Sequence, residues 1–176
     1  GAAREVSYAV LSEAAVITAV LTLSLQSGSV ALKVMLAPAA GTGAVLLAVG
    51  LFTVLLAENC RVPFDDPNTH LELTMIHEVM VLDHSGPPFA VVLHGAAMKL
   101  LLFSALLVQA VLPVGELSLI TALGVLTAGV LGVAVAAGLV ESLLARYAFR
   151  QVPLLLTTAF LLCVFALMIA WKGGAA

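Results

Sequence analysis

The sequence predicts an all-α, polytopic membrane protein with about five transmembrane helices and one long polar loop. The chain has 176 residues, of which 62% are hydrophobic and 10% are charged, and its mean hydropathy is +1.20. A soluble domain usually carries about 25% charged residues. Seven Lys and Arg with ten Asp and Glu cannot cover a water-exposed surface. Lipid must therefore cover it, and we treat residues 1–176 as a single transmembrane domain.

Five segments are long and apolar enough to cross a bilayer. A helix needs about 20 mostly apolar residues for this, at a rise of about 1.5 Å per residue. Each segment is predicted to be helical, because an open strand cannot satisfy its backbone groups in lipid. The expected crossings run from Tyr8 to Leu25, Gly41 to Ala57, Phe89 to Leu112, Leu117 to Leu139, and Val152 to Trp171.

Orientation is predicted from the basic residues that flank these crossings. Cytoplasmic loops carry an excess of Lys and Arg. Alternating the helix ends puts four such residues on the side of the long loop and two on the other: Arg4, Arg61, Arg146 and Arg150 against Lys33 and Lys172. We therefore expect a multi-pass protein of the inner or plasma membrane, with loop 58–88 in the cytoplasm.

The loop over residues 58–88 differs from the rest of the chain. It holds seven of the 17 Asp, Glu, Lys and Arg residues. Pro63 and Pro67 favour an extended first half, Thr69 and Glu72 form a capping-box pattern that begins a short helix, and Gly86 ends it. An apolar stripe at helical spacing makes this helix amphipathic: Leu71, Met75, Ile76, Val79 and Met80.

Three histidines in the loop share one helical face. His70, His77 and His84 are spaced seven residues apart, about 10.5 Å along a helix. One metal ion with ligands about 2.0–2.1 Å away cannot bind histidines so far apart. We therefore predict no metal site, and we favour contact with a partner subunit over a proton relay.

Several charges lie in or beside the crossings. Lys99 is eleven residues into the third crossing, where a charge is costly and usually functional. It indicates either an ion pair with a neighbouring helix or a role in proton conduction, and the two are compatible. Glu13 and Glu141 could line a polar path, and Glu58 gains from a cation such as Arg61, three residues later.

Other classes of chemistry leave no trace in the sequence. No P-loop, Rossmann fingerprint, HExxH or CxxC motif occurs. Cys60 and Cys163 are far apart, which supports neither a disulfide framework nor a metal pair. No Lys/Arg cluster suggests nucleic-acid binding. Small residues between Gly124 and Gly138 are typical of close helix packing.

The loop carries a recognisable signature: a Glu, an Arg three residues later, then Pro-x-Asp-x-Pro and a Glu-Leu pair. Here these are Glu58, Arg61, Pro63, Asp65, Pro67, Glu72 and Leu73. The chain resembles the family that unites subunit 1 of NADH:quinone oxidoreductase (complex I) with the membrane anchor of formate hydrogenlyase-type group 4 NiFe hydrogenases. Residues 69–78, THLELTMIHE, follow the hydrogenase branch, whereas Phe64 follows the complex I pattern and Asp83-His84 replaces Glu-Tyr. The first crossings of the family are absent, so we expect an N-terminally truncated member.

The resemblance implies a non-catalytic subunit that docks the peripheral arm and couples electron transfer to ion movement. It binds no cofactor itself; iron–sulfur clusters and the NiFe centre are expected in the partners. These are the hydrogenase large and small subunits, a ferredoxin-like subunit and antiporter-like membrane subunits. Expected docking residues are Arg61, Pro63, Pro67, His70, His77 and Asp83. Expected ion-path residues are Glu13, Glu58, Asp65, Glu72, Glu78, Lys99 and Glu141.

Three alternatives stay open. A quinone-chamber subunit of an NADH:quinone oxidoreductase would place the same loop beside a quinone headgroup, with Phe64 as its sequence support. An independent secondary ion transporter usually shows internal repeats and broken helices, and we find no repeat. An inert anchor would use its embedded charges as ion pairs alone. Proton or sodium, the direction of movement and the electron donor are all left open.

Overall fold

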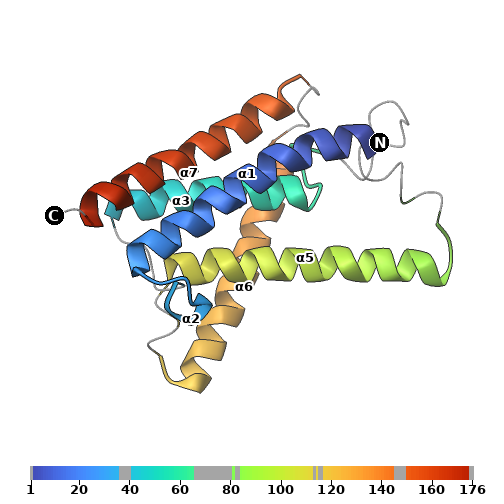
Figure 1. Cartoon of the computed structure of the whole chain (residues 1–176). Helices are drawn as coiled ribbons and strands as arrows, with labels where there is room; N and C mark the ends of the chain where they lie inside the picture. The colour runs from blue at the N-terminus through green and yellow to red at the C-terminus, as the bar shows by residue number, and fades with distance from the viewer. Residues whose placement is uncertain are drawn as a thin grey trace.

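The structure is a computed structural model of the chain, and its described residues form five long helices and one short one (Figure 1). It describes residues 2–35, 41–65, 81, 84–112, 114, 117–144 and 150–174. The helices are α1 (Ala2–Ser27), α2 (Leu32–Met35), α3 (Gly41–Glu58), α5 (Pro87–Val111), α6 (Leu119–Leu143) and α7 (Val152–Gly174).

The predicted membrane crossings are confirmed. Five helices of the described part are long and apolar enough to span a membrane, and their spans are Val6–Ser27, Gly41–Glu58, Pro87–Val111, Leu119–Leu143 and Val152–Lys172. Large apolar side chains point outward along them, among them Ile120 and Trp171, which are more than half exposed. An apolar outer surface is what lipid requires, so the chain is a multi-pass membrane protein.

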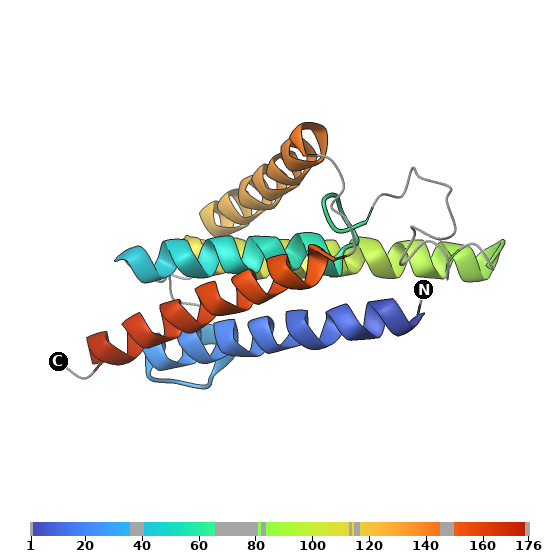
Figure 2. The ribbon, with the colours of Figure 1, turned by 90° about the horizontal axis from the view of Figure 1, so that it is seen from above.

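Helices α1, α3 and α7 pack together as the centre of the fold, and α5 lies against α3 (Figures 1 and 2). Close packing of α3 on α7 depends on Gly50. A Cβ there would lie 2.7 Å from Cys163 Sγ and 3.2 Å from the Ala159 carbonyl oxygen. The two helices therefore approach each other more closely than any larger residue at position 50 permits.

Helix α6 packs mainly on α5 and diverges from the other helices (Figure 2). Along α6, which the structure describes throughout, Ala137 alone is buried. Gly129 lies on Val108, whose Cγ1 would be 2.6 Å from an added Cβ. The predicted close packing is thus confirmed at Gly129, whereas a Cβ at Gly124, Gly132 or Gly138 would meet nothing within 4 Å in the described chain.

Candidate functional site

The end of α3 fixes the geometry of the site. The amide of Cys60 donates to the Ala57 carbonyl, and the amide of Arg61 donates to the Leu56 carbonyl. This pair of bonds is a Schellman motif, which requires a left-handed residue at its turn. Cys60 supplies it, with φ of 50°. The motif ends the helix at Glu58 and reverses the direction of the chain.

The segment after this turn packs inward. The amides of Phe64 and Asp65 both donate to the Arg61 carbonyl, and the Val62–Pro63 peptide is cis. Phe64 is 3% exposed and Asp65 2% exposed. The segment therefore brings a carboxylate and an aromatic ring into the protein interior beside Glu58.

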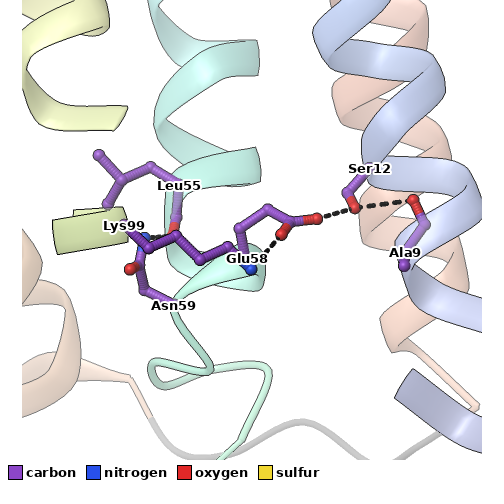
Figure 3. Close-up of polar contacts among 6 residues, drawn as sticks. All are labelled: Ala9, Ser12, Leu55, Glu58, Asn59 and Lys99. Carbon is purple, nitrogen blue, oxygen red and sulfur yellow. Dashed lines mark hydrogen bonds and ion pairs between the residues drawn. The ribbon is translucent and has the colours of Figure 1, made fainter. Parts of the chain in front are cut away.

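Glu58 joins three helices (Figure 3). Its Oε2 lies 2.5 Å from Lys99 Nζ on α5. Its Oε1 accepts a hydrogen bond from Ser12 Oγ on α1, and the same hydroxyl lies 3.0 Å from the Ala9 carbonyl oxygen, a second acceptor for its one hydrogen. A carboxylate with a cation on one oxygen and a hydroxyl donor on the other is well compensated for its partial burial.

Lys99 lies twelve residues from either end of α5, yet it is level with the last residue of α3, because the first half of α5 extends beyond α3 (Figure 1). An unpaired charge at the centre of a membrane helix costs about 2.5–3.5 kcal/mol. The expected ion pair with a neighbouring helix is present, and Glu58 is its partner.

A second ion pair ties the turn to α6. Arg61 Nη1 lies 3.3 Å from Glu141 Oε1, and the two side chains are 41% and 30% exposed. The sequence had suggested Arg61 as a partner for Glu58. In the structure each of the two pairs with another helix instead, because the Schellman turn carries Arg61 past the helix end toward α6.

A cavity of about 240 Å³ opens beside Glu58. Its polar lining comes from α1, α3, the turn after α3, and α5: Tyr8, Ser12, Glu13, Glu58, Cys60, Asp65 and Lys99. From α7 it receives the apolar side chains of Val152 and Leu156, and Phe64 closes another wall. Carboxyl, hydroxyl and ammonium groups thus line one cavity, which is a suitable lining for water and for ions in transit.

A smaller cavity of about 140 Å³ also borders the ion pair and lies between α3 and α5. Glu58, Cys60 and Lys99 line both cavities; the rest of the lining is Asn59, Val92, Gly95 and Ala96. Asn59 donates from Nδ2 to the Leu55 carbonyl at 2.8 Å. Its Oδ1 is buried and accepts no hydrogen bond within the described structure.

Of the predicted ion-path residues, Glu13, Glu58, Asp65 and Lys99 come together around the larger cavity. Glu141 does not line it; it pairs with Arg61 instead. Pro63, a predicted docking residue, is buried within the chain, where it shapes the turn. The remaining predicted residues lie outside the described ones: Pro67, His70, Glu72, His77, Glu78 and Asp83.

Three polar residues of the site were not anticipated: Tyr8, Ser12 and Asn59. Ser12 could have been found, since it lies in a predicted crossing, where a serine hydroxyl commonly bonds to a neighbouring helix. Asn59 follows Glu58 and carried no such signal, because its importance depends on how α5 lies. Within the described ranges, no group of three His, Cys, Asp or Glu residues could hold a metal ion.

Five apolar helices, three of which meet at the Glu58 ion pair beside a cavity with polar groups in its wall, define an integral membrane protein with a polar site among its helices. Residues 1–172 match the model of the family described as NADH dehydrogenase, so the chain belongs to that family, the subunit 1 family of complex I. It is a membrane subunit of a complex I-like, multi-subunit oxidoreductase. Comparisons with curated proteins and with solved structures gave no match.

Proposed function

We propose that this chain is the membrane anchor of a formate hydrogenlyase-type group 4 NiFe hydrogenase. In this role it docks the peripheral hydrogenase arm and couples electron transfer there to proton or sodium movement. Loop 58–88 faces the cytoplasm, and the chemistry of hydrogen takes place on iron–sulfur and NiFe centres of the partner subunits. The sequence from Thr69 to Glu78 supports the hydrogenase branch of the family.

The observation that carries the coupling role is the Ser12–Glu58–Lys99 cluster at the wall of the larger cavity. Charges inside membrane helices are expensive and usually belong to ion pathways. The Ser12–Glu58–Lys99 cluster lies where α3 passes into the loop that is proposed to dock the peripheral arm. A movement of that loop is therefore transmitted directly to the backbone that holds Glu58.

A quinone-chamber subunit is the second candidate, because Phe64 and Tyr8 bring aromatic rings to the cavity wall. The volume favours an ion path. Ligand pockets usually measure about 300–1,000 Å³, whereas the cavity beside Glu58 measures about 240 Å³. Quinone-dependent activity in the purified complex would favour the quinone chamber instead.

The experiment compares Glu58→Gln and Lys99→Met in the assembled complex in inverted membrane vesicles, measuring hydrogen formation and ion uptake together. We expect assembly to persist and ion uptake per hydrogen formed to fall about tenfold or more, because a transferring carboxylate or its counter-ion is lost. Lys172→Met is the matched control, since Lys172 is exposed at the end of α7. Wild-type coupling in both site variants would refute the proposed path.

Docking is tested separately. Arg61→Ala should weaken retention of the hydrogenase subunits on the membrane, whereas Arg150→Ala, which removes an exposed arginine two residues before α7, should not. Equal retention in the two variants would remove Arg61 from the docking surface.

A further inference from the structure

The buried Oδ1 of Asn59 is an acceptor without a donor in the described structure, and this is costly. A buried polar atom that makes no hydrogen bond loses its interaction with water and gains nothing in return. Asn59 lies directly after Glu58, and it shares the smaller cavity with Lys99. Figure 3 shows the stem of Lys99 passing Asn59 on its way to Glu58.

The Lys99 side chain has room to move on this side. Its neighbours one turn earlier on α5 are Gly95 and Ala96, which line the smaller cavity together with it. A Cβ added at Gly95 would meet nothing within 4 Å among the described residues. The space beside the lysine stem is thus kept open by small residues, and it reaches from Glu58 to Asn59.

We propose that Asn59 is a positioning residue for Lys99: its Oδ1 is the second acceptor to which the Lys99 ammonium moves when Glu58 becomes neutral. This rests on the proposed function, in which Glu58 carries the ion. In the structure the ammonium pairs with the Glu58 carboxylate. When a proton arrives at Glu58 from the larger cavity, the attraction is lost, and Lys99 keeps its own proton while it turns to the Asn59 oxygen.

The groups around Glu58 favour this movement of the Lys99 ammonium from Glu58 to Asn59. Facing groups on α1 are Tyr8, Ser12 and Glu13, those after α3 are Cys60 and Asp65, and α7 presents Val152 and Leu156. All of them line the larger cavity, from which the ion arrives, and of these only Cys60 also lines the smaller one. Asn59 lines the smaller one, so a move toward it takes the positive charge of Lys99 out of the ion's way.

The direct test is a structure of the whole complex with Glu58→Met, which removes the carboxylate and keeps an unbranched apolar chain. We expect Lys99 Nζ about 2.7–3.2 Å from Asn59 Oδ1. Lys99 on any other acceptor, with Asn59 Oδ1 still unpaired, would overturn the proposal.

A functional test uses Asn59→Leu and Asn59→Gln in the same vesicles. Leucine has about the size of asparagine but offers no acceptor, whereas glutamine keeps the amide oxygen. We expect ion uptake per hydrogen formed to fall about tenfold or more with leucine, because the ammonium then has to leave Glu58 without a partner, and to recover substantially with glutamine. Equal coupling in the two variants would contradict the proposal.

The two proposals can fail separately. If Glu58→Gln and Lys99→Met both leave ion uptake intact, the proposed ion path itself is wrong. If Glu58→Gln abolishes coupling while Asn59→Leu retains it, the path stands and the role of Asn59 falls.

Discussion

Lys99 lies at the midpoint of α5, and its ammonium is 2.5 Å from the carboxylate of Glu58, the last residue of α3. The centre of one crossing is thus tied to the end of another. Ser12 extends the tie to α1 through the other carboxylate oxygen. A single glutamate therefore links three helices at the point where the chain leaves the bundle for its charged loop.

The first prediction concerns the energy of this tie. Glu58→Gln and Lys99→Met should each destabilise the assembled complex, because each leaves a partner unpaired, and the double variant should cost less than the sum of the two. We expect a coupling energy of about 0.5–3 kcal/mol. Because Lys99 is partly exposed, we expect the coupling energy to lie toward the lower end of this range. Thermal unfolding of the detergent-purified complex is measured for the wild type, the two single variants and the double variant. Strict additivity of the losses in stability would show that the ion pair contributes nothing.

The second prediction concerns Ser12. Ser12→Ala removes the donor to Glu58 Oε1 but leaves Lys99 in place, so we expect the fold to persist with a loss of about 1.5–3 kcal/mol for a bond to a charged group. Ser12→Thr should restore most of it, since the hydroxyl is retained. Ser24→Ala serves as the control, because that hydroxyl bonds only to backbone near the end of α1 in the described structure. Equal losses in Ser12→Ala and Ser24→Ala would argue against a special contact.

Much of the fold could be predicted from hydropathy, because crossing length is set by bilayer thickness. The residues that form the larger cavity were also anticipated in part: Glu13, Glu58 and Lys99 were singled out as charges in or beside apolar segments, and Asp65 through the family signature of the loop. Their partners were not. The sequence suggested a local Glu58–Arg61 interaction, whereas the pairing in the structure depends on the level at which α5 and α6 pass the end of α3. Such offsets between helices arise from tertiary packing, which periodicity does not encode.

The third prediction concerns the turn that ends α3. Cys60 has φ of 50°, a conformation that L-residues other than Gly and Asn rarely adopt. Cys60→Val should destabilise the complex by about 1–2 kcal/mol, because a β-branched side chain clashes there. Cys60→Asn should be tolerated. Thermal unfolding together with the coupling ratio tests this; a valine variant as stable as the asparagine variant would show that the turn is not constrained.

The fourth prediction concerns the contact of α3 with α7. Gly50→Ala would place a Cβ 2.7 Å from Cys163 Sγ and 3.2 Å from a backbone oxygen, so we expect a loss of about 1–3 kcal/mol from overpacking. Cys163→Ala in the same chain removes the nearer atom and should recover part of the loss. Gly132→Ala is the matched control in a membrane helix, since its Cβ would meet nothing within 4 Å in the described structure.

The last prediction concerns how α6 is held. Gly129→Ala would bring a Cβ within 2.6 Å of Val108 Cγ1 and 2.8 Å of its Cγ2. Because α6 buries so little of itself elsewhere, relief comes most easily by moving α6 away from α5. That movement would carry Glu141 away from Arg61, so the ion pair should weaken along with the helix contact. Gly129→Ala should therefore lower membrane retention of the peripheral subunits in the same direction as Arg61→Ala, and Val108→Ala should restore it by removing both methyl groups. Full retention in Gly129→Ala would show that α6 is held by contacts other than this one.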